Sequence, residues 1–377
     1  MKILRISRSY PPNFDGTAFH VYELSKCQAV KGSVFLYQPH KENIHQSNSF
    51  NIYSPPFCDV FIKHNKIYKS KVIILIFHFF VMIDVILKRK KLKFDIIHCH
   101  NDIFDVFWWI PFSWWTKVPL ILTVHAGLNQ SKLYTMIARR IFANVDRIIC
   151  VSKKIEDELV NLGIHKSKIF VISSGIDLEG IKLVIDEFSH QPAKGKKVVT
   201  VGRLDPMKNF GCLIDAFKQL DLHDISLTII GDGMEREILQ QQAKDDPRII
   251  FTGAMSREEI YRHLARSDLF VMSSIKLGGQ EEGTPTAMME ALGAGLPIIT
   301  TNSGGIAELL KEYPLKWIVP QNDSKKLAEA MVEFFHLPDF EKDQLKKISR
   351  QIAQKKDWSI IAEKVGEVYK DVLFPSH

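Results

Sequence analysis

Short runs of apolar residues alternate with stretches of helical periodicity along the whole chain. The runs that indicate strands lie at 2–7, 94–100, 118–125 and 145–152 in the first half, and at 196–204, 225–233, 267–274 and 296–304 in the second. Strands without polar alternation are buried on both faces, as in parallel sheets that helices cover. The pattern predicts an α/β protein with enough strands for two doubly wound sheets.

The chain length also indicates two domains, because 377 residues are too many for one ordinary hydrophobic core. The stretch "SHQPAKGKK", residues 189–197, is polar and contains Pro192 and Gly195, so it is the best candidate for a linker. We expect the first domain to end at residue 188.

A long apolar stretch, residues 72–87, is interrupted by His78 and Asp84. As a helix it would be about 24 Å long, which is short of the ~30 Å hydrocarbon core of a membrane. One interpretation is a buried helix against the N-terminal sheet. The other is contact with a membrane surface, because Trp and Lys favour the membrane interface. Lysines and one arginine flank the stretch at 63, 66, 69, 71, 88–91 and 93, and "FWWIPFSWW" follows at 107–115.

Composition and charge narrow the class of protein. Apolar residues make up 46% of the chain and charged residues 25%, which is typical of a globular protein and excludes a disordered one. Five widely spaced cysteines without a C-x-x-C pair indicate neither a disulfide framework nor a zinc site. The start, "MKILRISRSYPP", resembles a strand and not a signal peptide, so we expect a cytoplasmic protein.

The positive charge is concentrated in the first half. Residues 1–190 contain 25 Lys and Arg against 16 Asp and Glu. This asymmetry predicts an anionic partner for the N-terminal half. Because no nucleic-acid motif is present, we expect a membrane surface and no nucleic acid.

Candidate chemistry follows the strands, since ligands of doubly wound sheets bind beyond the carboxyl ends of the strands. Gly16, in "SYPPNFDGTAFHVYEL", could let backbone amides approach an anion, or could simply supply a turn with positive φ. Arg203 and Lys208, in "GRLDPMKNF", suit phosphate oxygens, with a solvated charge pair as the alternative. Gly231 and Gly233 lack the third glycine of a dinucleotide fingerprint.

The stretch "EEGTPTAMMEALGAG", residues 281–295, places carboxylates on both sides of a predicted helix start. Thr284 is the expected N-cap and Pro285 the first helical residue. Carboxylates accept hydroxyl hydrogen bonds, so Glu290 suits a ribose diol and Glu282 a sugar hydroxyl. The alternative is that both carboxylates only complement the helix dipole.

Taken together, these residues resemble a family 4 retaining glycosyltransferase of GT-B fold. The resemblance rests on "SYPPNFDG", "FDIIHCH", "LTVHAG", "ICVSK", "SSGID", "GRLDPMKNF", "IIGDG", "FTGAMSREEIYRHLARSDLFVMSS" and the E-x7-E stretch with "LPIITTNSGGIAELL", which occur in the family's order over nearly the whole chain. Two positions depart from the family pattern. Asp15-Gly16 stands where two glycines are usual, and "SSG" replaces Asn-Gly before Asp177.

The resemblance implies two Rossmann-like domains that face each other across a cleft. An acceptor-binding domain would cover residues 1–188 and a nucleotide-sugar-binding domain residues 189–356. A C-terminal helix, residues 357–377, would cross back to the N-terminal domain. The implied reaction is hexosyl transfer from a nucleotide diphosphate sugar, with UDP favoured over GDP, to a hydroxyl of an oligosaccharide or lipid-linked saccharide. Such enzymes build bacterial surface polysaccharides, including lipopolysaccharide, from the inner face of the membrane.

The resemblance also implies the roles of individual residues. The catalytic set would be His125, Arg203, Lys208 and Glu282. The donor-binding set would be Gly16, Gly231, Gly233, Met255, Gly283, Thr284, Pro285 and Glu290. No metal or other cofactor is expected, because the chain has no D-x-D pair. His98 and His100 share a strand face without a third ligand in view.

Two other functions use similar architecture. A nucleotide-sugar 2-epimerase would convert or hydrolyse the donor without an acceptor, and a catalytically silent binder would bind the donor without turnover. Incubation of donor without acceptor separates these alternatives from a transferase.

Overall fold

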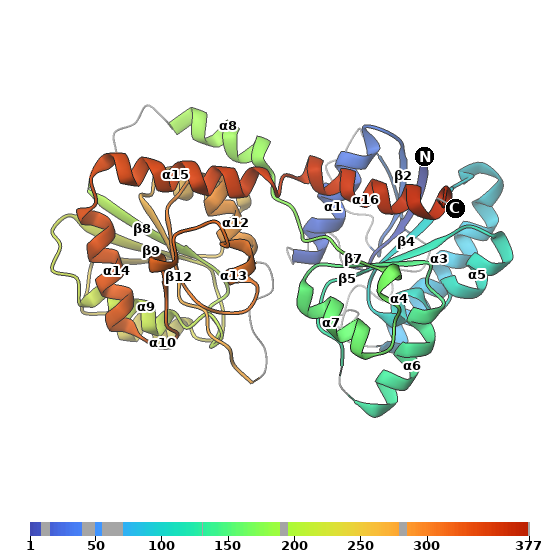
Figure 1. The fold of residues 1–377 in the computed structure, drawn as a ribbon, viewed down its shortest axis with the longest axis horizontal. Helices are drawn as coiled ribbons and strands as arrows, with labels where there is room; N and C mark the ends of the chain where they lie inside the picture. Colours follow the sequence, from blue (N-terminus) through green and yellow to red (C-terminus); the bar gives the residue numbers. More distant parts are fainter. Residues whose placement is uncertain are drawn as a thin grey trace. The chain divides into compact units, whose positions relative to one another are not determined.

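The computed structural model describes residues 1–8, 16–39, 50–54, 71–129, 131–188, 195–278 and 285–375. The chain forms two compact units. Unit 1 comprises residues 1–175 and 358–377, and unit 2 comprises residues 176–357. Each unit is built on a parallel sheet with helices on both faces (Figure 1). The expected α/β class is therefore confirmed.

The sheet of unit 1 has the strand order β3-β2-β1-β4-β5-β6-β7 among the described residues. All of its neighbouring strands are parallel. Its strands are β1 (Lys2–Ile6), β2 (Ser33–Tyr37), β3 (Asn51–Tyr53), β4 (Ile96–Asn101), β5 (Leu120–Val124), β6 (Arg147–Cys150) and β7 (Ile169–Val171). The order reverses between β1 and β4, so the carboxyl ends of these strands are where a ligand is expected.

Alternate residues of β1 pack on opposite faces of this sheet. Ile3 lies in a hydrophobic cluster with α1 (Gly16–Ala29) and α16 (Trp358–Leu373). Leu4 and Ile6 belong to the cluster on the other face, with helices α3 to α7. Those helices are α3 (Lys71–Leu92), α4 (Ile103–Val106), α5 (Trp109–Thr116), α6 (Lys132–Ala143) and α7 (Lys153–Asn161), and the short 3-10 helix Lys166–Lys168 follows. The C-terminal helix therefore returns to the first unit, where it contacts α1.

Unit 2 repeats the design with the strand order β10-β9-β8-β11-β12-β13. Its strands are β8 (Lys196–Val201), β9 (Ile225–Ile230), β10 (Ile249–Gly253), β11 (Leu269–Met272), β12 (Ile298–Thr301) and β13 (Ile318–Val319). Its helices are α8 (Leu178–Phe188), α9 (Phe210–Lys218), α10 (Arg236–Ala243), α11 (Arg257–Ala265), α12 (Thr286–Gly293), α13 (Ile306–Leu309), α14 (Ser324–His336) and α15 (Asp339–Gln354), with the 3-10 helix Leu315–Trp317. Buried apolar side chains of these strands and helices form one hydrophobic cluster.

The division between the units falls at Ile176, earlier in the chain than the expected end of the first domain at residue 188. The physical reason is the packing of α8, since Ile181 and Val184 are buried in the core of unit 2. The expected linker overlaps β8, which begins at Lys196, and its first six residues, 189–194, lie outside the described residues. The functional roles assigned to the two domains remain predictions.

The apolar stretch at 72–87 forms part of α3, a helix of 22 residues that also includes the basic residues 88–91. The two polar residues within the stretch both lie on its buried side. Asp84 accepts a hydrogen bond from Tyr37 Oη at 2.7 Å, and His78 lies 3.1 Å from a carboxylate oxygen of Asp105. One face of α3 is thus a core face, as the first interpretation expected.

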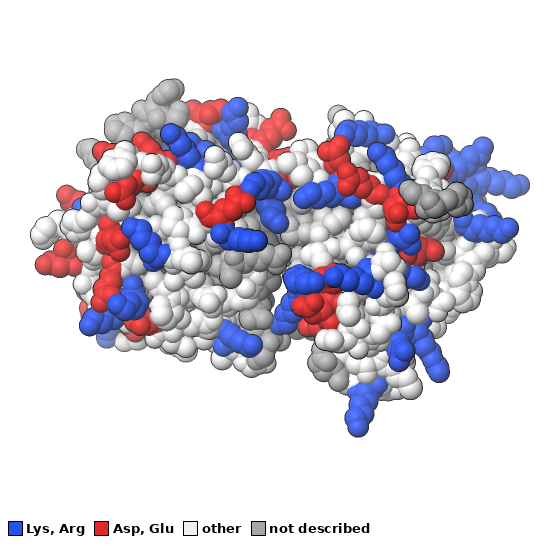
Figure 2. Space-filling view, viewed as in Figure 1, with Lys and Arg blue, Asp and Glu red and all other residues white. Residues whose placement is uncertain are grey.

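The opposite side of α3 is apolar yet exposed. Its exposed apolar residues are Val72, Phe79, Ile83, Ile86 and Leu87, and Phe107, Trp114 and Trp115 are exposed near and within α5. Basic side chains gather along the right-hand edge of unit 1 in Figure 2. The Arg89 guanidinium lies 4.9 Å from the Trp115 ring centroid, so the basic and aromatic residues form one surface. Among the described residues, no helix meets the length and apolarity needed to cross a membrane.

Candidate active site

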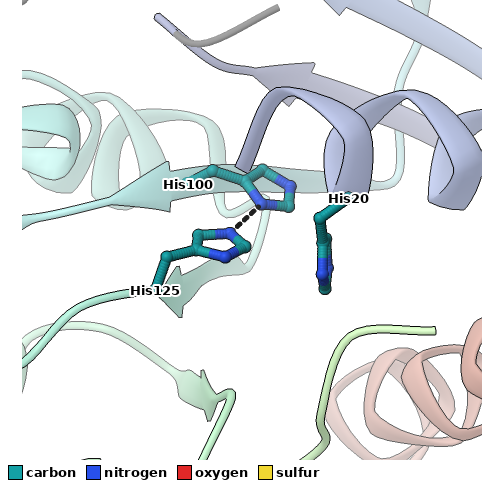
Figure 3. Close-up of side chains that lie close together, drawn as sticks. All are labelled: His20, His100 and His125. Carbon is teal, nitrogen blue, oxygen red and sulfur yellow. Dashed lines mark hydrogen bonds between the residues drawn. The ribbon is translucent and has the colours of Figure 1, made fainter. Parts of the chain in front are cut away.

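Histidines from three elements converge on one side of the unit 1 sheet. His98 and His100 occupy alternate positions of β4, and His125 directly follows β5. His20 comes from α1 and is positioned by Val21 and Leu24, which pack the helix against the sheet. His100 Nδ1 lies 3.2 Å from His125 Nε2 (Figure 3). His20 Nδ1 lies 3.0 Å from Ser174 Oγ. The parallel topology therefore groups residues that are more than 100 positions apart.

The histidines are held in the neutral state. Burial lowers the pKa of His125 to about 4, although the Asp105 carboxylate opposes the shift. Burial, followed by the charges of neighbouring groups, also places the pKa values of His20, His98 and His100 well below their ordinary range. At neutral pH these imidazoles therefore act as hydrogen-bond donors and acceptors without charge.

A buried arginine contributes to this electrostatic environment. Arg5 is completely buried in β1 and donates hydrogen bonds to Ser25 Oγ at 2.7 Å, to Gln28 Oε1 and to Tyr369 Oη at 3.0 Å. Each of these partners is neutral. Tyr369 Oη also lies 2.6 Å from His98 Nδ1, so α16 connects the arginine to the histidines. The positive charge of Arg5 lowers the pKa values of three of the histidines.

The geometry of the cluster would permit a metal ion. His20, His100 and His125 each offer a ring nitrogen, and these atoms lie within 4.8 Å of one another. Neutral imidazole is a common ligand of zinc. The sequence showed no third ligand beside His98 and His100. In the structure, His20 of α1 and His125 after β5 lie close to His100, whereas His98 is not part of this group. The buried charge of Arg5 opposes a cation here, and metal independence remains a prediction.

Asn101, at the end of β4, is a second feature that sequence reasoning missed. Its φ of +102° is unusual for a residue with a side chain, and its Nδ2 atom is buried without a hydrogen-bond partner among the described residues. Unusual backbone conformations of this kind concentrate at functional sites. The only signal in the sequence is an Asn-Asp pair at a strand end.

In unit 2, the loop after β8 carries the two predicted phosphate ligands. The Arg203 side chain is 80% exposed, and its guanidinium lies 3.2 Å from the Asp205 carboxylate. Lys208 is half-buried, and its carbonyl accepts a hydrogen bond from Ser273 Oγ at 2.9 Å. Asn209, with a φ of +52°, then leads into α9. The backbone of the loop is therefore fixed, while the arginine side chain is accessible to a ligand.

Gly231 and Gly233 are required by the packing of this loop against the loop after β9. A Cβ atom on Gly231 would lie 1.9 Å from the carbonyl oxygen of Gly202, and one on Gly233 would lie 2.4 Å from that of Leu204. Gly231 also has a φ of +144°. The two glycines thus have a structural role, and their predicted contact with the donor is untested.

Helix α12 begins one residue later than expected. Pro285 is its N-cap and Thr286 its first residue, and no side chain within the described part of the chain caps it. The expected assignment of Pro285 as the first helical residue was wrong, because its ψ of 107° is still extended. The other predicted residues of this stretch, Glu282, Gly283 and Thr284, lie outside the described residues.

Glu290 is buried in α12, where it makes an ion pair. Its Oε1 lies 3.1 Å from Arg257 Nη1 of α11. Burial raises the pKa of Glu290, Arg257 opposes the shift, and Asp177 adds to it. A buried carboxylate with a single cationic partner retains hydrogen-bonding capacity for a ligand. The alternative role, a simple complement to the helix dipole, does not explain this burial.

The two remaining predicted donor residues lie in different units. Met255 follows β10 and packs, partly buried, against the core of unit 2. Gly16 is the first residue of α1, and a Cβ atom there would meet open space. Its φ is not positive, so the interpretation as a turn glycine was wrong.

Two family models together match most of the chain. The model described as Glycosyltransferase Family 4 matches residues 14–179, and the one described as Glycosyl transferases group 1 matches residues 182–355. The chain therefore belongs to the group 1, or family 4, glycosyltransferases, and it is a glycosyltransferase of the GT-B fold. The expected family and enzyme class are thereby confirmed.

Several curated proteins are similar in sequence. The amylovoran biosynthesis glycosyltransferase AmsK of Erwinia amylovora is 31% identical over 199 residues, which cover 51% of this chain and 48% of that protein. The putative colanic acid biosynthesis glycosyltransferase WcaL of Escherichia coli is 28% identical over 58% of this chain and 55% of that protein. The chain thus spans about half the length of these relatives.

Solved structures with the same fold cover the chain completely or nearly so. HepE from Anabaena, crystallised in complex with UDP, has a TM-score of 0.75 at 20% identity, over 98% of this chain and 100% of that one. The sucrose-phosphate synthase of Thermosynechococcus elongatus also has a TM-score of 0.75, at 19% identity, over the full length of both chains. These likenesses establish the fold.

Proposed function

We propose that the protein transfers a hexosyl group, with retention at the anomeric carbon, from a UDP-sugar to a hydroxyl of a lipid-linked saccharide in bacterial surface polysaccharide synthesis. The observation that carries the proposal is the fixed loop after β8, which presents an exposed Arg203 and a half-buried Lys208 at the carboxyl edge of a parallel sheet. Unit 2 is the proposed donor-binding unit and unit 1 the acceptor-binding unit. The occurrence of UDP in the HepE crystals supports a UDP donor, and the printed functions of AmsK and WcaL support a polysaccharide product.

In the proposed reaction, the bond between the anomeric carbon and the diphosphate oxygen breaks while the acceptor oxygen bonds to that carbon from the same face. The acceptor proton passes to the departing diphosphate, so no separate protein base is needed. Arg203 and Lys208 would stabilise the negative charge that develops on the diphosphate. Glu290 would bind the ribose, and His125, which is neutral, would bind the transferring sugar.

A donor panel tests the reaction. The protein is incubated with UDP- and GDP-sugars, with and without a lipid-linked saccharide, and the anomeric configuration of the product is read by NMR. We expect an α-linked product from an α-configured UDP donor, and only in the presence of acceptor. Epimerisation of the donor in the absence of acceptor would instead favour a nucleotide-sugar 2-epimerase. Tight binding of the donor without turnover would favour a catalytically silent binder.

We also propose that unit 1 docks on the inner face of the membrane through the basic and aromatic surface of α3 and α5. Lys88 is partly neutralised by Asp84, at 2.7 Å, so Arg89, Lys90 and Lys91 contribute most of the charge. The alternative is that these three residues only complement the dipole at the C-terminal end of α3. The exposed aromatic residues beside them favour docking, since Trp prefers the level of the lipid headgroups.

Co-sedimentation with vesicles separates these interpretations. We expect wild-type protein to bind anionic vesicles at low salt and to dissociate at high salt. A variant with residues 88–91 changed to Gln should lose this binding. A control variant with Gln at Lys325, Lys326, Lys346 and Lys347, in unit 2, removes the same charge elsewhere and should bind normally. Equal, negligible binding of wild type to anionic and neutral vesicles would exclude docking.

A further inference from the structure

The histidine cluster contains a residue that touches the proposed sugar-binding histidine but belongs to neither predicted site set. We infer that His100 is a positioning residue, which fixes the tautomer and ring orientation of His125 through the 3.2 Å contact between His100 Nδ1 and His125 Nε2. This inference rests on the proposed function, in which His125 binds the transferring sugar. The two imidazoles face each other in this way in Figure 3.

The direction of the hydrogen bond follows from the environment of the other ring nitrogen of His100. His100 Nε2 is buried and has no hydrogen-bond partner among the described residues. A proton on Nε2 would leave a buried N–H donor unpaired, which costs about 1–3 kcal/mol, whereas an unpaired acceptor is tolerated more often. We therefore assign the proton to His100 Nδ1, which donates it to the lone pair of His125 Nε2.

The tautomer of His125 then follows. Because both rings are neutral and His125 Nε2 accepts, the proton of His125 must reside on Nδ1. In Figure 3 this second nitrogen of His125 points away from His100. His125 is also more exposed than His100, which is fully buried. His100 thus makes His125 a neutral donor whose N–H is available to a sugar oxygen.

His98, two residues earlier on the same strand face, has the opposite arrangement. Its Nδ1 lies 2.6 Å from Tyr369 Oη, and its Nε2 lies 2.8 Å from Thr123 Oγ1. Tyr369 Oη accepts from Arg5, and of its two possible acceptors among the described residues His98 Nδ1 is much closer than Gln28 Oε1, which lies 3.5 Å away. We therefore assign the hydroxyl proton to the bond with His98 Nδ1 and the ring proton of His98 to Nε2. Neighbouring histidines of β4 therefore hold opposite tautomers, which gives an internal reference for the experiment.

The first measurement needs no turnover. Protein labelled with ¹⁵N in histidine is recorded in long-range ¹H–¹⁵N spectra, and the signals are identified by single substitutions of His98, His100 and His125. In the wild type we expect the Nδ1–H tautomer for His100 and His125 and the Nε2–H tautomer for His98. An Nε2–H tautomer for His125 in the wild type would overturn the inference.

The second measurement compares variants of His100. His100→Leu removes the donor and should lower kcat about ten- to a hundredfold, the range seen when a group that orients an active-site histidine is removed, with little change in the donor KM. His100→Asn retains an N–H close to the position of Nδ1 and should recover most of the loss. Thr123→Val is the matched control, because it deletes a buried hydrogen bond beside the cluster without touching the pair of His100 and His125.

The outcomes separate this inference from the proposed function. If His100→Leu leaves both the His125 tautomer and kcat unchanged, or if His100→Asn is as impaired as His100→Leu, His100 is only structural. If His125→Ala keeps full turnover while the wild-type tautomers are as assigned, the proposed role of His125 fails instead. Folding of the His100 and His125 variants is monitored by the His98 signal, and folding of Thr123→Val, which changes a contact of His98, is monitored by its melting temperature.

Discussion

In the proposed reaction, two side chains on the loop after β8 stabilise the departing diphosphate. Replacement of Arg203 or Lys208 by Ala should lower turnover by about 10²-fold or more, because each removes one preorganised positive donor. Steady-state kinetics with saturating donor would measure the loss. Lys316→Ala, which removes an exposed lysine paired with Glu333, is the control and should leave turnover unchanged. Full activity of both active-site variants would remove the phosphate role.

Glu290 provides a test of buried charge that does not depend on knowing the substrate. Its pKa is raised from the ordinary 4.5, so the unfolded carboxyl ionises first as the pH rises. The contribution of Glu290 to the free energy of unfolding is therefore present below pH 4.5 and is lost as the pH rises through the higher folded value. Relative to wild type, Glu290→Gln should gain stability as the pH increases from 4.5 to 7.

Denaturant unfolding at several pH values would measure this difference. A difference that stays constant with pH would mean that the Arg257 contact fully compensates the burial. If Glu290 binds the ribose, the donor KM of Glu290→Gln should also rise. This measurement tests the proposed donor contact independently of the stability measurement.

At the residue scale, the sequence predicted the positions of the candidate side chains in the fold better than it predicted their contacts. Arg203, Lys208 and His125 all lie just beyond strand ends, as the position of each motif indicated. The contacts of His20 with Ser174 and of Glu290 with Arg257 join different elements, and no local pattern specifies such pairs. Burial shifts the pKa values of His20 and Glu290, and this burial also cannot be predicted from a local sequence pattern.

At the scale of elements, Gly231 holds two loops together. Gly231→Ala should destabilise unit 2 by several kcal/mol, because the added methyl group would collide with the Gly202 carbonyl at a strained φ. Thermal unfolding would measure the effect. Gly366→Ala in α16 is the control, since a Cβ there meets open space in a helix, and it should be neutral or stabilising by about 0.4–1 kcal/mol. An unchanged melting temperature for Gly231→Ala would contradict the packing argument.

The predicted strands were found because they are long and apolar on both faces. Each of the eight runs contains a strand of the structure, from β1 to β12. The strands that the pattern missed include β3 and β13, with three and two residues, which are too short to show a period. Similarly, α3 extends to Leu92 beyond its apolar stretch, because Lys and Arg favour helix and the buried Leu92 packs its last turn against the core.

At the scale of the whole molecule, the two units should respond differently to acid. Four histidines of unit 1 have lowered pKa values, so they bind protons in the unfolded state first as the pH falls below their ordinary value of 6.5. Their contribution to stability is present above pH 6.5 and is lost as the pH falls toward their folded values. Among the described residues of unit 2, His263 has a lowered pKa. We expect unit 1 to unfold first near pH 5.

Tryptophan fluorescence would follow this transition, because Trp317 alone of the six tryptophans belongs to unit 2. His98→Asn should reduce the loss of melting temperature between pH 7.5 and pH 5. His165→Asn, at an exposed histidine, should not change it. Simultaneous unfolding of both units at every pH would contradict the expectation.

The return of α16 to unit 1 has a consequence for the order in which the chain is completed on the ribosome. Residues 176–357 form a continuous unit that is fully synthesised before α16 emerges. Arg5 and Gln28, which are made near the beginning, must wait for Tyr369 before their buried hydrogen bonds can form. Unit 2 can therefore fold during translation. Unit 1 becomes complete only after α16 has left the exit tunnel, and until then its Arg5 charge lacks one of its buried partners.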